Sequence, residues 1–270
     1  MRVLLATNPA NNPITNTVPA VVLAGGKAKP ALAELMGHDS RALFVYNGET
    51  LLERVVRSLS ETESVSEVTV IGEVPDSEHY RHFPDTNDFV MNVFAGAETY
   101  HDAPYLLFIT SDLPFITGEA VAAFVTASLQ CAEKTNASLV YPFVSVEECD
   151  RRFPEMKRTA LKIAGGVFTG GNAMLVRPAM LLKQRDRIAD AYAARKSPLR
   201  LAFMLGIGTV IRLLLSQKLS PRLLTQAFLE ERVSRLLGAN ARGVLLHAPE
   251  LAADLDKPED LKALKAKETA

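Results

Sequence analysis

Two glycines followed at once by lysines are the first residues in this chain that could do chemistry. The apolar run over residues 19–24 ends in Gly25 and Gly26, and Lys27 and Lys29 come directly after. Glycine lets the backbone approach a ligand that a Cβ would hold away, and amide donors beside ammonium groups suit a polyphosphate. An ordinary turn after a strand is the structural alternative. The segment therefore predicts a phosphate-binding loop.

Acidic residues at two further places could hold a metal ion. Asp112 comes soon after the apolar segment 105–109 and two residues before Pro114, so it would lie at the end of an extended strand. Asp254 and Asp256 would project to the same side of an extended chain, so one of them could share a metal with Asp112. Mg²⁺ prefers hard oxygen ligands and often takes only one or two protein carboxylates. Aspartates that cap a turn or start a helix are the structural alternative.

The elements that must position these residues alternate between strand-like and helix-like segments. Short apolar runs predict strands over 21–23, 68–71, 105–109 and 139–140. Apolar residues at helical spacing predict helices over 50–59, 88–100 and 118–132. This alternation indicates an α/β fold with a mixed, mainly parallel sheet covered by helices on both sides. Ligands of such sheets bind beyond the carboxyl ends of the strands, where both the two glycines and Asp112 would lie.

The pattern changes after residue 150. Strands are predicted over 157–163 and 173–176, on either side of a Gly-rich turn over 168–172, and a helix is predicted over 178–192. Ser-Pro pairs at 197–198 and 220–221 suit the first positions of helices, and Gly238 suits a helix end. These signals predict a helical-hairpin insertion over about 198–237, followed by a strand over 243–247.

Length and composition bound the class of protein. The 270 residues carry a net charge of -1, so wholesale nucleic-acid binding is not expected. Cys131 and Cys149 lack metal-ligand spacing and fit a reduced, cytoplasmic protein. The longest apolar segment, 201–211, is too short to span a bilayer, which takes about 20 residues. We expect a leader over 1–18 and a single domain over 19–270.

Four motifs together resemble the MobA-like nucleotidyltransferases, a family that includes molybdenum-cofactor guanylyltransferase and, more distantly, sugar-phosphate nucleotidylyltransferases. In chain order these motifs are Leu23-Ala24-Gly25-Gly26, Ser40-Arg41-Ala42-Leu43 with Gly48 before a helix, Ser111-Asp112-Leu113-Pro114, and Asp254-Leu255-Asp256-Lys257-Pro258-Glu259-Asp260. The resemblance covers about residues 19–145, 155–178 and 243–265. It implies a Rossmann-like, three-layer α/β/α nucleotidyltransferase (GT-A) fold, an NTP substrate and Mg²⁺ as cofactor.

The resemblance also assigns roles to residues. It implies that Asp112 and Asp256 hold the metal, with Asp254 as the alternative second ligand, and that nucleotide contacts come from the loop residues Leu23, Ala24, Gly25, Gly26, Lys27 and Lys29 and from Asn92. For Asn92, a helix cap is the structural alternative. The family's usual Arg-Met-Gly after the glycines is missing, and Arg41 replaces its usual lysine before Ala-Leu. Arginine keeps the positive charge but binds phosphate as a fork rather than as a point charge. Whether Lys27, Lys29 or Arg41 is the main triphosphate-binding residue therefore stays open.

Residues that could meet a second substrate lie in the later part of the chain. Lys157, Arg158 and Lys162 form a local basic cluster suited to an acceptor phosphate, with a solvated charged face as the alternative. The Gly-rich segment offers backbone amides and a side chain at Gly170, Gly171 and Asn172, with a plain hairpin as the alternative. The insertion over 198–237 is expected to shape an apolar acceptor pocket or a homodimer contact. A buried helix and a peripheral membrane contact are the other readings.

The first functional hypothesis is a Mg²⁺-dependent enzyme that transfers an NMP group from an NTP to a phosphorylated small molecule and releases pyrophosphate. The phosphate acceptor is already anionic, so the missing Ser/His/Asp arrangement does not argue against an enzyme. A GT-A-type glycosyltransferase that uses a sugar nucleotide is the second hypothesis. A nucleotide-binding module without turnover is the third.

Overall fold

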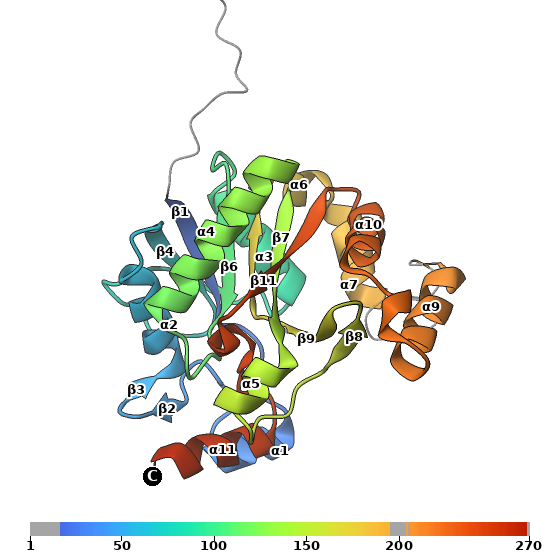
Figure 1. Ribbon diagram of the computed structural model, residues 1–270. Coiled ribbons are helices and arrows are strands. Elements are labelled where there is room, and N and C mark those ends of the chain that lie inside the picture. Colours follow the sequence, from blue (N-terminus) through green and yellow to red (C-terminus); the bar gives the residue numbers. More distant parts are fainter. Residues whose placement is uncertain (1–16, 195–203, 205, 269–270) are drawn as a thin grey trace, which may run out of the picture.

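The computed structural model describes residues 17–194, 204 and 206–268, so the expected leader lies almost wholly outside the described residues. The largest sheet in this part of the chain has nine strands in the order β5-β4-β1-β6-β10-β7-β9-β8, with β11 paired to β7 (Figure 1). The strands are β1 (Val18–Leu23), β4 (Val65–Ile71), β5 (Arg81–Phe83), β6 (Leu106–Thr110), β7 (Leu139–Ser145), β8 (Leu161–Ile163), β9 (Gly166–Gly170), β10 (Ala173–Val176) and β11 (Ala241–Leu246). The short strands β2 (Val45–Tyr46) and β3 (Glu49–Thr50) form a separate hairpin.

The sheet is mixed, as predicted. The strands β5, β4, β1 and β6 are all parallel, and β11 is parallel to β7. The strands β8, β9 and β10 pair antiparallel with their neighbours. The parallel ladders therefore bring the carboxyl ends of β1 and β6 side by side, and both candidate loops start there.

Helices cover both faces of the sheet and make the three predicted layers. They are α1 (Pro30–Met36), α2 (Leu51–Ser60), α3 (Phe89–Thr99), α4 (Gly118–Thr135), α5 (Val146–Arg152), α6 (Pro178–Lys183), α7 (Arg185–Ala194), α9 (Ile207–Lys218), α10 (Gln226–Leu237) and α11 (Pro258–Glu268). Two 3₁₀ helices, η1 (Pro221–Leu223) and η2 (Pro249–Ala252), join them.

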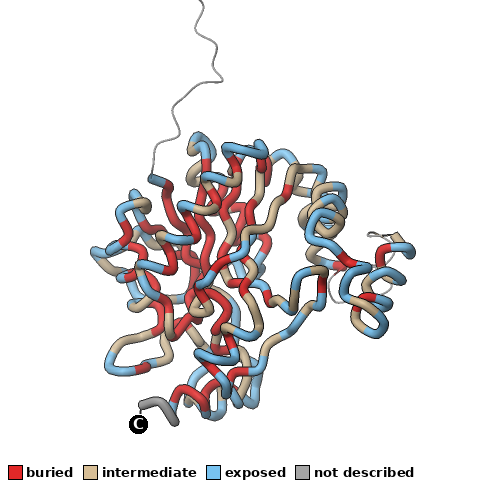
Figure 2. The backbone as a smooth tube through the Cα atoms, viewed as in Figure 1, coloured by how far each residue is buried: buried red, intermediate tan, exposed pale blue. Residues whose placement is uncertain are grey.

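Alternate residues of β1 explain why both faces are covered. Val22 packs with Val55 of α2 and Phe124 of α4, whereas Val21 packs on the other face with Val93 of α3. Burying an aliphatic side chain completely contributes roughly 1.5–3 kcal/mol, so two apolar faces require two helical layers. Figure 2 shows that the buried residues follow the central strands, whereas α9 and α10 are mainly half-buried or exposed.

Capping residues fix where the covering helices begin. The α2 helix begins with a capping box: the Glu53 amide donates to Thr50 Oγ1 at 3.1 Å, and the Thr50 amide donates to Glu53 Oε2 at 2.6 Å. This arrangement satisfies amide groups that a helix leaves unpaired at its first turn. At α4, the Thr117 hydroxyl accepts from the Ala120 amide at 3.2 Å, without a reciprocal side-chain bond. The predicted helices over 50–59, 88–100 and 118–132 are thus confirmed.

The later segments differ in detail from the sequence expectation. The first strand begins at Leu161 rather than at residue 157, and the glycines that turn the chain are Gly165 and Gly166, at φ 103 and 156. Residues 168–170 of the predicted turn instead belong to β9. Sequence reasoning took the wrong glycine pair as the turn because both pairs stand between β-forming residues.

The helical insertion also begins differently from the prediction. The first Ser-Pro signal, at 197–198, lies outside the described residues. The second opens only the short η1, and α10 begins after Thr225, whose hydroxyl accepts from the Phe228 amide at 3.2 Å. Gly238 ends α10 at φ 65, as expected. The predicted helix over 178–192 is divided into α6 and α7 at Gln184.

Candidate active site

The glycine loop follows β1 at the rim of the sheet. A Cβ added at Gly25 would lie 2.7 Å from Asp85 Oδ1 and 2.8 Å from Asn92 Nδ2, so only glycine fits this position without movement. Gly26 has φ 92, a conformation that side chains disfavour. Glycine therefore suits both positions of the loop. That the loop binds phosphate stays a prediction.

Asp85 is a residue of this site that sequence reasoning missed. Its Oδ1 accepts from Asn92 Nδ2 at 2.7 Å, and its Oδ2 accepts from the Gly26 amide at 3.4 Å. The only signal was its place in the polar run after Phe83, where turns and caps also occur. Asn92 is buried in α3 and does not cap it, because Asp88 accepts from the first-turn amides. Asn92 instead holds Asp85 against the glycine loop.

Asp112 follows β6 and is held by Arg41. The side chain of Asp112 is buried, and its Oδ2 lies 2.8 Å from Arg41 Nη1. The same Arg41 nitrogen lies 3.4 Å from Asp256 Oδ1, and Lys29 Nζ lies 2.9 Å from Asp256 Oδ2. The motifs that contain Arg41, Asp112 and Asp256 therefore meet at one place, although they lie far apart in the sequence.

Asp254 completes the acidic cluster from its other side. Its Oδ1 accepts from Asn172 Nδ2 at 3.2 Å. Burial and the neighbouring charge of Asp112 raise the pKa of Asp254 to about 6. Burial disfavours the charged form of a carboxyl group, and a second carboxylate nearby disfavours it further. The cluster therefore carries negative charge that is not fully compensated by Arg41 and Lys29.

These carboxylates fit a magnesium ion. Asp112 Oδ1 is buried and has no hydrogen-bond partner within the described part of the chain. A cation beside Asp112 and Asp254 would give that oxygen a partner and relieve the repulsion that raises the Asp254 pKa. The described residues contain no group of three or more His, Cys, Asp or Glu side chains in metal-binding geometry, but Mg²⁺ needs only one or two protein carboxylates.

The glycine loop and Asp112 line one cavity of about 880 Å³, whereas Asp254 and Asp256 are not among its lining residues. Its lining includes Leu23, Ala24, Gly25, Gly26, Lys27, Arg41, Asp85, Asn92, Asp112 and Tyr192. Lys27 is exposed and pairs with Asp39 at 2.9 Å. The volume lies within the range of small-molecule sites, roughly 300–1,000 Å³. The structure thus brings the glycine loop, Arg41 and Asp112 to a common space, and their binding of phosphate and metal stays a prediction.

The residues predicted to bind an acceptor do not form one cluster. Lys157 and Lys162 are exposed, whereas the Arg158 side chain is nearly buried and pairs with Asp150 at 3.0 Å. The Asn172 side chain reaches Asp254, and Gly170 and Gly171 lie just before it, at the end of β9. Their roles toward a substrate stay predictions. Of these residues, Asn172 has a direct contact with the acidic cluster.

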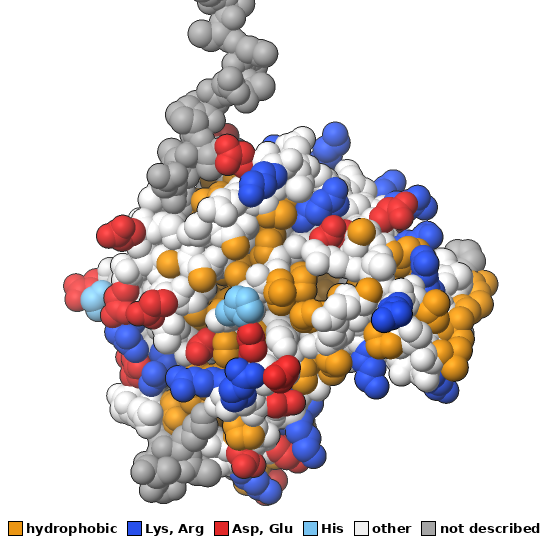
Figure 3. Space-filling model, in the orientation of Figure 1, with side chains coloured by type: hydrophobic (Ala, Val, Ile, Leu, Met, Phe, Trp, Pro, Cys, Tyr) orange, Lys and Arg blue, Asp and Glu red, His pale blue; other side chains and the backbone are white. Residues whose placement is uncertain are grey.

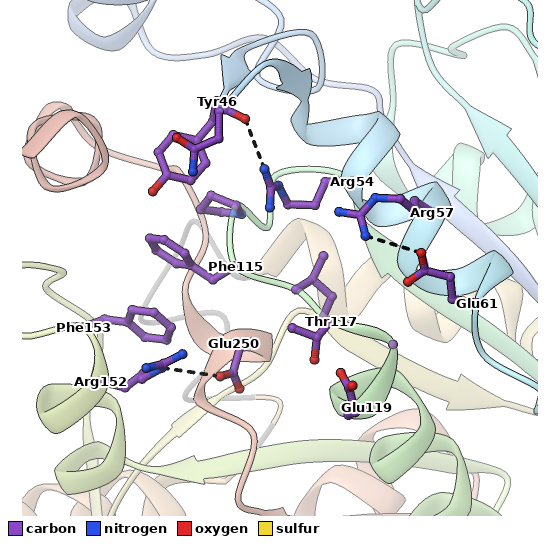
Figure 4. A pocket seen from close by; sticks show the side chains of 14 residues that line it. Tyr46, Arg54, Arg57, Glu61, Phe115, Thr117, Glu119, Arg152, Phe153 and Glu250 are labelled. Atoms are coloured by element: carbon purple, nitrogen blue, oxygen red, sulfur yellow. Dashed lines mark hydrogen bonds and ion pairs between the residues drawn. The ribbon is translucent and has the colours of Figure 1, made fainter. Parts of the chain in front are cut away.

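A second cavity, of about 490 Å³, lies between α2 and α5 and is shown in Figure 4. In Figure 4, Arg57 of α2 faces Glu61 and Arg152 of α5 faces Glu250, whereas Arg54 of α2 donates to the Tyr46 carbonyl. Arg54 also pairs with Glu49 at 2.8 Å. Arg57 Nη2 lies 2.9 Å from Glu49, and Arg152 Nε lies 3.8 Å from Glu250. Because these positive charges are neutralised within the cavity, it offers no excess charge to an anionic ligand.

Comparison with known proteins gives the family. The sequence profile of the MobA-like NTP transferase domain matches residues 20–157. The chain belongs to this family. A solved structure described as a hypothetical transferase from Thermus thermophilus is 33% identical, with a TM-score of 0.77 over 91% of this chain and 99% of that one. No curated protein sequence matches the chain significantly.

More distant solved structures share the fold. CMP:2-keto-3-deoxy-manno-octonic acid synthetase complexed with CTP is 14% identical, with a TM-score of 0.55 over 94% of this chain and 98% of that one. The 4-diphosphocytidyl-2C-methyl-D-erythritol synthase from Anaerococcus prevotii is 11% identical, with a TM-score of 0.53 over 95% of this chain and 98% of that one. The MobA-like family member described here is thus a nucleotidyltransferase with the predicted α/β fold. Among its described helices, none is long and apolar enough to cross a membrane.

Proposed function

We propose that this nucleotidyltransferase moves an NMP group from an NTP to a phosphorylated small molecule, with Mg²⁺ as cofactor and pyrophosphate as the second product. One observation carries the proposal. Asp112 lines the same cavity as the Gly25–Gly26 loop, and its buried Oδ1 has no hydrogen-bond partner among the described residues. A triphosphate on the loop amides would place its negative charge close to a carboxylate pair, and only a cation between them makes that arrangement favourable.

The residues of the chain bind and orient the reactants. The loop amides and Lys27 would bind the phosphates of the NTP, and Arg41 would turn from Asp112 and Asp256 toward them. Asp112 with Asp254 or Asp256 would hold Mg²⁺, which when bound supplies positive charge to the reacting phosphates. An oxygen of the acceptor phosphate forms a bond to the α-phosphorus, the bond to the β-phosphate oxygen breaks, and pyrophosphate leaves. No general base is needed, because the attacking oxygen is already anionic.

Turnover assays test the proposal. We would incubate the protein with each of the four NTPs, Mg²⁺ and a panel of phosphorylated acceptors, and measure the release of pyrophosphate. Pyrophosphate release with at least one pair, lost in Asp112→Ala, supports the proposal. Release of a nucleoside diphosphate from a sugar nucleotide would favour a glycosyltransferase instead, and Mg²⁺-dependent NTP binding without turnover would favour a regulatory module. We further propose that the protein works in the cytoplasm, where NTPs are available and where the thiols of Cys131 and Cys149 would stay reduced.

A further inference from the structure

The helix α9 is inverted, because its buried side is polar and its exposed side is apolar. Thr209 and Ser216, two turns apart on one side, are 6% and 1% exposed. On the other side, large apolar residues at helical spacing are 39–74% exposed: Ile207, Ile211, Leu214, Leu215 and, just after the helix, Leu219. We name these five residues the α9 apolar face.

Polar groups contribute to the attachment of α9 to the rest of the protein. Gln217 Oε1 accepts from the Lys162 amide at 3.0 Å, and Gln217 Nε2 donates to the Lys162 carbonyl at 2.9 Å. A surface helix of a globular protein normally turns its apolar side toward the core instead. In the space-filling view, hydrophobic side chains gather over α9 at the right edge of the molecule (Figure 3). An uncovered apolar patch of this kind marks an interaction surface.

The charged residues of this segment are all basic. Residues 204–229 contain Arg212, Lys218 and Arg222 but neither Asp nor Glu, although the whole chain has a net charge of -1. All three basic residues are exposed. Lys218 follows Leu214 by four residues, so it projects from the same side of α9 as the apolar face. The segment therefore fits a partner that is both apolar and negatively charged.

The carboxylates of the neighbouring helix α10 do not neutralise these cations. Glu230 Oε2 lies 3.9 Å from Arg242 Nε, and Glu231 pairs with Arg235 within α10. In the part of the chain that the structure describes, no ion pair joins a carboxylate to a basic residue of the segment 204–229. The Arg212 guanidinium instead lies 4.4 Å from the centre of the Phe228 ring. The positive charge of the segment is therefore available to an anionic partner.

We propose that α9 binds an anionic lipid surface and lies in its plane, so that the protein attaches to a membrane without spanning it. The α9 apolar face would enter the boundary between lipid head groups and acyl chains, as amphipathic helices with basic residues do. Arg212, Lys218 and Arg222 would contact the lipid phosphates, and the long apolar stem of Lys218 would let its ammonium group reach them. The cytoplasmic leaflet of a membrane carries anionic lipids, so this attachment agrees with the proposed location.

A second copy of this chain fits the α9 apolar face less well than a lipid surface does. In a two-fold symmetric dimer, the same patch of each copy faces the other. The basic residues of 204–229 would then come together, and the same segment has no carboxylate to pair with them. Lipid phosphates supply that negative charge, so the charge pattern favours a membrane.

Sedimentation with lipid vesicles tests the proposal on the full-length protein. One set of vesicles contains phosphatidylcholine alone, and in the other set a third of the lipid is phosphatidylglycerol. The dissociation constant should be at least tenfold lower for the anionic vesicles, and added NaCl should reduce this difference, because salt screens surface charge. No binding to either set, or equal affinities for both sets at low salt, would overturn the proposal.

Removing apolar surface from α9 should weaken the binding of vesicles. Leu214→Gln should raise the dissociation constant for anionic vesicles at least tenfold, because Leu214, 54% exposed, would leave water on binding. The matched control Leu35→Gln changes a leucine of α1 that is 47% exposed, and should leave vesicle binding unchanged. Thermal unfolding checks that both variants fold. Vesicle affinity equal to that of wild type in a folded Leu214→Gln variant would contradict the role of α9.

Removing one positive charge tests the electrostatic part of the proposal. Lys218→Gln should weaken the binding of anionic vesicles about fivefold, as expected for one lysine near an anionic surface. The matched control Lys134→Gln removes an exposed lysine from the end of α4 and should leave the affinity unchanged. Equal affinities of the two variants for anionic vesicles would count against lipid binding by this segment.

Oligomeric state and turnover separate this inference from its alternatives. If wild type is a dimer that Leu214→Gln converts to a monomer, and no vesicles bind, the α9 apolar face belongs to a second copy and the proposal fails. The inference goes beyond the proposed nucleotidyl transfer and does not depend on it. Vesicle binding without pyrophosphate release from any NTP would leave the attachment standing and sink the transfer reaction, and release without vesicle binding would do the reverse.

Discussion

Arg41 Nη1 lies 2.8 Å from Asp112 Oδ2 and is directed at the carboxylate that the family motif assigns to the metal. The same nitrogen also reaches Asp256 at 3.4 Å. The Arg41 guanidinium therefore lies next to both carboxylates, in a position that a metal ion would also favour. Because like charges repel, we expect Arg41 to weaken the binding of Mg²⁺ alone and to strengthen the binding of an NTP.

Replacing Arg41 should therefore have opposite effects on the affinities for two ligands, Mg²⁺ alone and the Mg²⁺–NTP complex. Arg41→Ala should raise the affinity for Mg²⁺ alone, and should lower the affinity for the Mg²⁺–NTP complex by about tenfold, as for a lost charged hydrogen bond of ~1.5 kcal/mol. Calorimetric titration with each ligand measures both effects. Arg41→Lys, which keeps the charge and loses the fork, should lie between wild type and Arg41→Ala. If both affinities fall together in Arg41→Ala, the competition described here does not occur.

Asp254 should make the stability of the metal-free protein depend on pH. Its pKa is raised from 3.8 to about 6, so the folded state favours the protonated form. Protonated Asp254 therefore contributes to the free energy of unfolding at pH values below the unfolded-state pKa. This contribution, of up to about 3 kcal/mol, is lost as the pH rises from about 4 through 6. Urea unfolding at pH 5 and pH 7.5 measures it. Addition of Mg²⁺ should stabilise the protein more at pH 7.5 than at pH 5.

The isosteric variant Asp254→Asn serves as the control for this pH effect. It carries no charge at any pH, so its metal-free stability should change less between pH 5 and pH 7.5 than that of wild type. An identical pH dependence in both proteins would assign the effect to other groups.

The glycine loop is tested by filling the space at Gly25. Gly25→Val should weaken NTP binding at least tenfold, because its Cβ would meet Asp85 and Asn92 at 2.7 and 2.8 Å and displace the loop. Gly208→Val is the matched control, because nothing lies within 4 Å of a Cβ there. Calorimetry with each NTP and Mg²⁺ gives the affinities. Equal NTP affinity in the two variants would make the loop a structural turn only.

Among the described residues of the insertion, Leu224 should be structural, whereas Ile207 should be replaceable. Leu224 is 0% exposed, and its carbonyl accepts from the Ala164 amide at 2.7 Å, next to the β8–β9 turn. Leu224→Ala should lower the free energy of unfolding by about 2–5 kcal/mol. Ile207, 68% exposed on α9, should tolerate the same change within about 0.5 kcal/mol. Chemical denaturation compares them, and equal losses would show that α9 is packed against a partner.

The sequence was most informative where local rules act alone. The strand before Gly25, the helix after Thr50 and the strand before Asp112 were all predicted, because hydrophobic periodicity depends on neighbours in the chain. Asp85 was missed because its role comes from contacts with Gly26 and Asn92 across the fold.

The central claim is that the cluster around Asp112 binds the metal and nucleotide, and Mg²⁺-dependent NTP binding tests it most directly. We would measure the melting temperature of wild type, Asp112→Ala and Asp102→Ala with each NTP, with and without Mg²⁺; Asp102 is exposed and lies outside the lining of the cavity. At least one NTP should raise the melting temperature of wild type and Asp102→Ala only when Mg²⁺ is present, because a ligand that binds the native state stabilises it. Asp112→Ala should show no such rise. The same Mg²⁺-dependent rise in a folded Asp112→Ala variant would contradict the account.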